Sequence, residues 1–269
     1  MAVIRGAGKG GGGSSQPQQR VPQEDPDSLQ SVQFATVLDL ISEGEIDGIE
    51  GGVKGILLDD TPIQDARGNN NFQGYTVVTR NGTQSQAYIP NLTGNESEKG
   101  VGVALTNGSP ITRSISNSEV DRVRVTLQVP RLQRIEDDGD IRGASVSISI
   151  QLQYNGGGYT TVVNDTISGK TSDSYQRDYM LTLTGSFPVD VRVIRNTADS
   201  TSSRLENSTN WSSFTEIIDE KLRYPNSALA FLKFDSRQFR NIPSRRYLVR
   251  GIKVRVPNNA TVDTTTHLG

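Results

Sequence analysis

Two segments of this 269-residue chain alternate apolar and polar residues, a pattern that β-strands with one buried face require. Between Arg122 and Val129 every odd-numbered residue is Val or Leu, and the even-numbered residues are Arg, Thr or Gln. Between Ser145 and Tyr154 the apolar residues take every even position, opposite Ser and Gln. A helix would need a period of 3.6 residues. Both segments therefore predict antiparallel strands with one face in water.

Turn signals and shorter alternating segments predict further strands around these two. Asn155–Gly158 reads Asn-Gly-Gly-Gly and supplies the positive-φ positions that a hairpin needs. Additional strands are predicted at 159–163, 179–183 and 189–195. Together they indicate an antiparallel sandwich over about residues 112–197, followed by a Ser/Thr-rich exit at 197–203.

The first part of the chain gives weaker signals. Residues 1–28 are rich in Gly, Pro and Gln and predict a flexible Gly-rich arm. Val32–Leu40 fits both a helical stripe and strand alternation, and we favour a strand because Gly44 and Gly48 follow closely. Further strands are predicted at 53–58 and 76–79, and a long loop region at 80–110.

The last part of the chain, 211–257, is ambiguous in structure and rich in positive charge. Residues 212–222 fit a helix, but the Tyr224-Pro225-Asn226 turn and the apolar segment 228–234 make a hairpin equally credible. A strand is predicted at 247–256, and Trp211 is expected to be a core anchor. This basic block contains ten basic and four acidic residues, although the whole chain has a formal charge of only −2. Either a solvated strand face or a surface for acidic partners explains it.

Composition removes most catalytic chemistry. The chain has no cysteine and one histidine, His267, so thiolate chemistry, disulfides, Cys/His zinc sites and Ser-His-Asp relays are excluded or nearly so. We expect no enzyme activity and no cofactor. We find no apolar run long enough to span a membrane as a helix and no secretion signal, so we expect a soluble chain made without Sec-type export.

Several short motifs resemble functional sites, but each has a simpler structural interpretation. Lys9 with Gly10–Gly13 lacks the strand and helix of a phosphate loop, and Ser168–Thr171 ends like one but is expected to be a turn. The weak metal candidates Asp137, Asp138 and Asp140 could bind a hard cation, but an exposed acidic hairpin tip is the simpler interpretation. The acidic residues Glu119, Asp121, Glu216 and Asp219 are candidates for a carboxylate pair only by composition.

Four separated segments resemble a known family in the same order. They are ISEGEIDGIEGGVKGILLDDTPI (41–63), NGSPITRSI (107–115), NWSSFTEIIDEKLRYPNSALAFLKFDSRQF (210–239) and RRYLVRGIKVRVPNN (245–259). The chain is similar over residues 29–260 to the amino-terminal hub region of the tip attachment proteins J, the host-specificity or central-fibre proteins of lambda-like siphophages.

The resemblance implies an all-β fold with a split β-barrel hub domain interrupted by an inserted antiparallel β-sandwich. The barrel halves would be residues 29–111 and 205–258, the insertion 112–204, the arm 1–28 and a C-terminal tail 259–269. It also implies a homotrimeric ring at the distal tail tip of the virion, made in the host cytoplasm. Relatives continue beyond the VPNN motif into further hub domains and a receptor-binding tip.

Partners follow from the same resemblance. We expect the ring to join the tail tube to receptor-binding parts, to enclose a lumen that the tape-measure protein occupies, and to pass DNA only during ejection. Candidate interaction residues are basic ones in the arm and in the basic block: Arg5, Lys9, Arg20, Arg237, Arg240, Arg245, Arg246 and Arg250. The alternative is a carbohydrate-binding sandwich or adhesin module, using Tyr154 and Tyr159 beside the glycine-rich hairpin.

Overall fold

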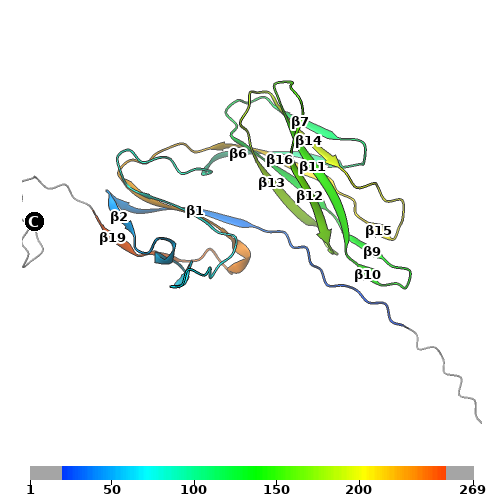
Figure 1. Cartoon of the computed structure of the whole chain (residues 1–269), viewed down its shortest axis with the longest axis horizontal. Helices are drawn as coiled ribbons and strands as arrows, with labels where there is room; N and C mark the ends of the chain where they lie inside the picture. Colours follow the sequence, from blue (N-terminus) through cyan, green and yellow to red (C-terminus); the bar gives the residue numbers. More distant parts are fainter. Residues whose placement is uncertain (1–19, 253–269) are drawn as a thin grey trace, which may run out of the picture.

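The computed structural model describes residues 20–252, which form an all-β protein built from six antiparallel sheets. Figure 1 shows two groups of sheets side by side. Within the described residues the only helical turns are two short 3-10 segments, Gly52–Gly55 and Ser236–Gln238. The all-β class predicted from the alternating segments is therefore confirmed.

One group is a sandwich of two four-stranded sheets, with strand orders β13-β8-β16-β6 and β12-β11-β14-β7. Its strands are β6 (Thr93–Ala104), β7 (Ile111–Ile115), β8 (Arg122–Val129), β11 (Ala144–Tyr154), β12 (Thr160–Gly169), β13 (Tyr175–Thr182), β14 (Val189–Arg195) and β16 (Asn210–Asp219). A small sheet, β10-β9-β15, lies at one end and consists of β9 (Gln133–Ile135), β10 (Ile141–Arg142) and β15 (Leu205–Glu206).

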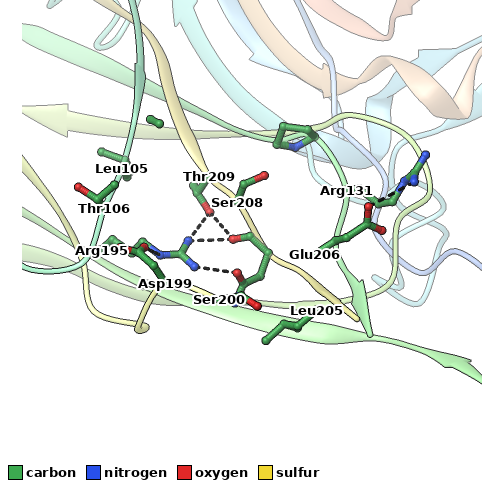
Figure 2. Close-up of a pocket in the computed structure, with 13 residues that line it drawn as sticks. Leu105, Thr106, Arg131, Arg195, Asp199, Ser200, Leu205, Glu206, Ser208 and Thr209 are labelled. Carbon is green, nitrogen blue, oxygen red and sulfur yellow. Dashed lines mark hydrogen bonds and ion pairs between the residues drawn. The ribbon is translucent and has the colours of Figure 1, made fainter. Parts of the chain in front are cut away.

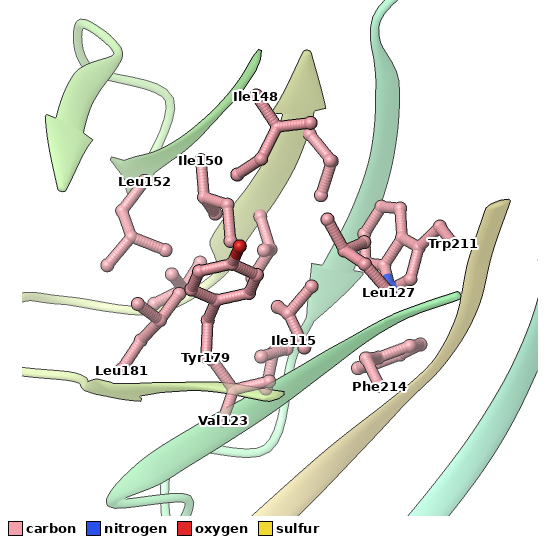
Figure 3. Close-up of a cluster of buried hydrophobic side chains, with 14 of the residues drawn as sticks. Ile115, Val123, Leu127, Ile148, Ile150, Leu152, Tyr179, Leu181, Trp211 and Phe214 are labelled. Atoms are coloured by element: carbon pink, nitrogen blue, oxygen red, sulfur yellow. The ribbon is translucent and has the colours of Figure 1, made fainter. Parts of the chain in front are cut away.

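The alternating residues of the sequence form the core between the two large sheets (Figure 3). Val123, Val125 and Leu127 of β8 face Ile148 and Ile150 of β11, all fully buried. Trp211 of β16 is 0% exposed in the same cluster and donates from its Nε1 to the Ser213 carbonyl at 2.9 Å. Trp211 thus anchors the sandwich core.

The second group, called here the three-sheet unit, contains the sheets β1-β17-β5, β18-β3-β4 and β19-β2. Its strands are β1 (Phe34–Glu43), β2 (Ile46–Ile49), β3 (Ile56–Leu58), β4 (Thr61–Pro62), β5 (Thr76–Asn81), β17 (Ser227–Asp235), β18 (Arg245–Tyr247) and β19 (Val249–Ile252). Ile56, Leu58 and Ile63 pack against Leu232 and Phe234 in a core separate from that of the sandwich.

The sheets of residues 20–252 are all open, and none is closed as a barrel. The edge strands β1 and β5 are hydrogen-bonded only to β17, so the largest sheet of the three-sheet unit does not close on itself. The split barrel that the family resemblance implies is therefore not seen as a closed sheet in the described residues.

Strand pairing extends the sandwich beyond the expected insertion at 112–204. β6 and β16 lie outside that range and belong to a sandwich sheet. The prediction of loop over 80–110 is wrong for β6, because this twelve-residue strand is almost wholly exposed and polar, and its backbone pairing with β16 holds it in place. An edge strand of this kind carries no alternating signal.

The segments 212–222 and 228–234 are both strands, but they do not pair with each other. β16 pairs with β6 and β8 in the sandwich, whereas β17 pairs with β1 and β5 in the three-sheet unit. The helix alternative is wrong, and the Tyr224–Asn226 turn carries the chain between the two groups. The predicted strand at 53–58 is a 3-10 turn followed by β3, and within the described part of 247–256 there is a break at Leu248.

Residues 20–31, called here the strap, run in extended form along the sandwich before β1 begins (Figure 1). Ion pairs and backbone hydrogen bonds fix residues 20–29, so residues 20–28 of the expected flexible arm are anchored rather than free. Arg5 and Lys9 of the arm, and the glycine motif at 9–13, lie outside the described residues.

Candidate protein interface

The acidic loop between β9 and β10 is neutralised by arginines. Asp137 pairs with Arg204, and Asp138 pairs with Arg20. Asp140 accepts from Arg20 at 2.8 Å, from Arg142 at 2.7 Å and from the Gln23 backbone N–H at 2.8 Å. The Gln23 N–H, together with the two guanidinium groups, holds the pKa of Asp140 below its usual range.

These contacts use the oxygens that a hard cation would need. Within residues 20–252, no group of three acidic or histidine side chains is placed to hold a metal ion. The structure therefore gives Asp138 and Asp140 a different partner, the Arg20 side chain. Arg20, one of the expected interaction residues, fastens the strap to its own sandwich and remains half-exposed.

The basic block is partly neutralised inside the chain. Four of its cations form ion pairs: Lys221 with Asp121, Arg237 with Asp235, Arg245 with Asp39, and Arg246 with Asp60. The Arg245 pair is half-buried and joins β18 to β1, because its Nε lies 2.6 Å from Asp39 Oδ2 and the Tyr247 hydroxyl donates to the same oxygen. Arg245 therefore has an internal structural partner.

Among the described cations of the basic block, those that remain for other molecules are Arg223, Arg240 and Arg250. All three are exposed, and none has a carboxylate partner within residues 20–252. Lys233 differs from them, since its ammonium lies 4.8 Å from the centre of the Phe34 ring and burial lowers its pKa. Of the interaction candidates in the basic block, Arg240 and Arg250 thus stay available to a partner.

Three of the four candidate carboxylates outside the loop are also held by cations. Asp219 accepts from the Arg122 Nε at 2.9 Å, Asp121 accepts from Lys221 at 2.7 Å, and Glu216 lies 2.5 Å from Lys99. Burial raises the pKa of Asp121, but the hydrogen bonds from Lys221 and the Asp219 backbone N–H and the nearby positive charges together outweigh burial, so the pKa lies below its ordinary value. A general acid would need the opposite shift.

The two tyrosines beside the glycine-rich hairpin are not free aromatic platforms. The guanidinium of Arg192 lies 3.5 Å from the centre of the Tyr159 ring and covers one face of it. Tyr154 is half-buried against the sandwich core, and its ring lies so close to Gly185 that a Cβ there would be 2.4 Å from it. A sugar could not stack on Tyr159 from the covered side.

A cleft of about 540 Å³ lies where the small sheet meets the end of the sandwich (Figure 2). The residues that line it form no recognisable sequence motif. Arg195 forms its wall and is only 2% exposed. This guanidinium donates to the Asn207 carbonyl at 2.8 Å, the Asn207 Oδ1 at 2.9 Å and the Thr209 hydroxyl at 3.0 Å. Its Nε lies 3.1 Å from Asp199, an ion pair without the alignment of a hydrogen bond.

The other charged residues in the cleft lining are paired as well, since Arg131 lies 3.4 Å from Glu206 at the rim. The cleft is therefore a polar surface with balanced charge. Burial lowers the pKa of Arg195, and the Asp199 carboxylate opposes that shift. These contacts indicate that Arg195 has a structural role, which is to hold the segment 195–209 in place.

No helix among the described residues is long and apolar enough to cross a membrane.

Comparison with known proteins gives matches over most of the chain. Residues 95–220 match the family model of the FNIII-A domain of tip attachment protein J, a range that begins in β6 and ends just after β16. A tip attachment protein J from Escherichia phage SECphi4 is 41% identical over 256 residues, which are 93% of this chain and 22% of that protein. Its namesake from Escherichia phage SECphi27 is 35% identical over 250 residues, 92% of this chain and 21% of that protein.

Likeness to solved structures is weak. The CBM22-1 xylan-binding domain from Paenibacillus barcinonensis Xyn10C covers 72% of this chain and 99% of that chain, with 7% identity and a TM-score of 0.26. That score is too low to carry an argument. The family-model match, by contrast, covers the strands of the sandwich from β6 to β16. The chain spans about a fifth of the length of the two phage relatives. The chain belongs to the tip attachment protein J family.

Proposed function

We propose that this chain is a structural protein of a phage tail tip and that it takes part in host attachment. The observation that carries the proposal is the 41% identity, over 93% of the chain, to a protein whose name states tip attachment. The fold supports a structural role. Within residues 20–252 the chain is built of strands, and the candidate carboxylates Asp138, Glu216 and Asp121 form ion pairs inside the chain. No catalytic step is part of the proposal.

In finer detail, three copies would form a ring at the distal end of the tail. The ring would join the tail tube to the receptor-binding parts, surround a lumen for the tape-measure protein, and open for genome release. The open edges of β1 and β5 give the three-sheet unit places where neighbouring strands could complete the split barrel. The sandwich would be the insertion in that barrel, with its limits moved from 112–204 to the strands between Thr93 and Asp219.

The test of the proposed function is the location of the chain in the particle. Antibodies against the purified chain should label the distal end of the tail in negative-stain images of virions. A cryo-electron microscopy map of the tip should contain three copies around the axis. Absence of label from purified particles, or label on the capsid, would contradict the role, and another copy number would contradict the trimer alone.

The interface part of the proposal is tested at Arg240 and Arg250. The double substitution Arg240→Glu and Arg250→Glu should reduce incorporation of the chain into tails about tenfold or more, because it reverses two exposed unpaired charges. The melting temperature should not change. The matched control is Arg134→Glu together with Arg204→Glu, exposed arginines of the sandwich end. Normal incorporation of the first variant would exclude this surface as the interface.

A further inference from the structure

The strap lies along a surface at the end of the sandwich, called here the groove, which Ile141, Arg142, Gly169 and Lys170 form. Figure 1 shows the strap as the extended segment that leads from the N-terminal side toward β1, passing β10 and β9. Its backbone pairs with the sandwich at two places. The Asp25 N–H donates to the Ile141 carbonyl at 2.9 Å and the Ile141 N–H donates to the Gln23 carbonyl at 2.8 Å, while the Ser28 N–H donates to the Lys170 carbonyl at 2.9 Å.

Lys170 is the charged centre of the groove. It follows β12 and is only 3% exposed, yet it carries an ammonium group. Glu24 and Asp27 of the strap each place a carboxylate oxygen 2.7 Å from its Nζ. The Ser172 hydroxyl supplies a further partner at 3.0 Å. A buried ammonium without a counter-charge is costly, and the two strap carboxylates supply that counter-charge where the strap covers Lys170.

Three more features make the groove selective. Leu29 packs against a buried cluster of the sandwich that includes Val129, Leu132 and Tyr175. Gly169, with φ +147°, leaves the room that the strap needs, because a Cβ there would lie 2.6 Å from the Ser28 hydroxyl and 2.9 Å from Leu29. Arg142 adds a second positive contact, 2.7 Å from Asp25.

We propose that this groove is a specific peptide-binding site for an extended acidic segment followed by Ser-Leu, and that the strap is its releasable ligand. The elements are those of peptide recognition in general: backbone pairing for affinity, and a charge and an apolar contact for specificity. The site holds the strap from Arg20, which pairs with the acidic loop, to Leu29, which packs against the sandwich. This inference goes beyond the tail-tip role and does not depend on it.

The test uses the full chain with a weakened strap. The variant Glu24→Gln, Asp27→Asn and Leu29→Ala keeps the groove but removes two carboxylates and one apolar contact. Hydrogen exchange should show faster exchange of the Asp25, Ser28 and Leu29 amides, by at least about tenfold. The control variant Glu43→Gln, Glu119→Gln and Leu222→Ala likewise removes two carboxylates and one leucine side chain, at exposed positions elsewhere, and it should keep the wild-type exchange rates.

Peptide binding is then measured by fluorescence anisotropy, with the labelled peptide RVPQEDPDSLQS, which is residues 20–31. The weakened variant should bind the peptide at least about tenfold more tightly than the wild-type chain, because an attached strap competes at high effective concentration. A scrambled peptide should not bind. Adding Lys170→Met should abolish binding, and Lys170→Arg should retain most of it.

Each other result overturns the proposal. If the amides of the weakened variant stay protected, these three residues are not what holds the strap. If the amides exchange freely and the peptide still does not bind, the groove has no affinity of its own. If the scrambled peptide binds equally, the attraction is unspecific charge.

Discussion

At the scale of the residue, buried arginine and lysine side chains fasten segments that have little apolar surface. Arg195 holds the chain at Asn207 and Thr209, and Lys170 holds the strap. Both are nearly inaccessible to water, which is unusual for charged side chains. In the sequence, neither residue can be distinguished from an ordinary surface residue. Their hydrogen-bond and ion-pair partners are not sequence neighbours, and only the folded chain brings them together.

Arg195→Met should destabilise the sandwich by about 3 kcal/mol, since it leaves the Asn207 and Thr209 acceptors and the Asp199 carboxylate without their donor. Urea unfolding followed by the fluorescence of Trp211 measures this free energy. The control Arg134→Met removes an exposed arginine and should change it by less than about 0.5 kcal/mol. Equal changes in the unfolding free energy of the two variants would show that the buried hydrogen bonds of Arg195 contribute no more to stability than the contacts of an exposed arginine.

Asp39 gives the three-sheet unit a pH-dependent contact. Burial would raise its pKa, but the hydrogen bonds from Arg245 and Tyr247 outweigh burial and lower it. The contact therefore stabilises the fold above the unfolded pKa of about 4, and the stabilisation is lost as the pH falls through the lowered folded pKa. Asp39→Asn should cost about 1–2 kcal/mol at pH 7 and much less near pH 2.

Urea titrations of the wild-type chain and the variant at both pH values give the measurement. Asp60→Asn is the matched control, because the Asp60–Arg246 pair is exposed and should contribute little at either pH. A cost of Asp39→Asn that is the same at both pH values would contradict the assignment of the effect to the ionised carboxylate.

At the scale of the element, close backbone contacts decide where strands begin and end. Gly82 follows β5, has φ +86°, and lies where the chain leaves the three-sheet unit for the sandwich. A Cβ there would lie 2.6 Å from the Gly44 carbonyl oxygen and 3.1 Å from the Ala228 nitrogen. These are backbone atoms of neighbouring segments, and they cannot move aside as a flexible side chain would.

Gly82→Ala should therefore destabilise the chain by about 3 kcal/mol or more, combining a left-handed backbone with a steric clash. Gly108→Ala is the matched control, because Gly108 has φ +80° but open space around its Cα, and it should cost only about 1 kcal/mol. Thermal unfolding of both variants separates the two contributions. Similar costs would mean that the contact with Gly44 relaxes easily.

The strands also differ in how far the sequence could predict them. β8 and β11 were evident because one face of each is buried in a two-sheet core, which imposes alternation. β6 was missed because it is an exposed edge strand, stabilised by its pairing with β16 rather than by burial. A hairpin of β16 with β17 was one of two alternatives, but each pairs with a different strand, and the sequence does not indicate these pairings.

At the scale of the whole molecule, the two groups of sheets have separate cores, so they should unfold separately. Leu232 is 1% exposed in the core of the three-sheet unit, whereas Trp211 lies in the sandwich. Leu232→Ala should cost about 2–5 kcal/mol in the three-sheet unit alone. Far-UV circular dichroism should then show an early transition, while the Trp211 fluorescence midpoint stays unchanged.

Ile148→Ala is the reciprocal variant, because Ile148 is fully buried in the sandwich core. It should shift the Trp211 midpoint and leave the transition of the three-sheet unit in place. A Trp211 midpoint that moves equally in both variants would show instead that the strap and the two connecting segments couple the groups into one cooperative unit.

The sequence by itself determined the all-β class, the strands of the sandwich core and the lack of cysteine- or histidine-based chemistry, because alternation and residue type are local properties of the chain. It also carried the four segments by which the family is recognised. Only the tertiary structure decided that β6 and β16 complete the sandwich, that the three-sheet unit is open, and that arginines neutralise the acidic loop. These outcomes depend on which distant backbones and charges meet, and strand pairing and ion pairing across more than a hundred residues leave no periodic signal in the sequence.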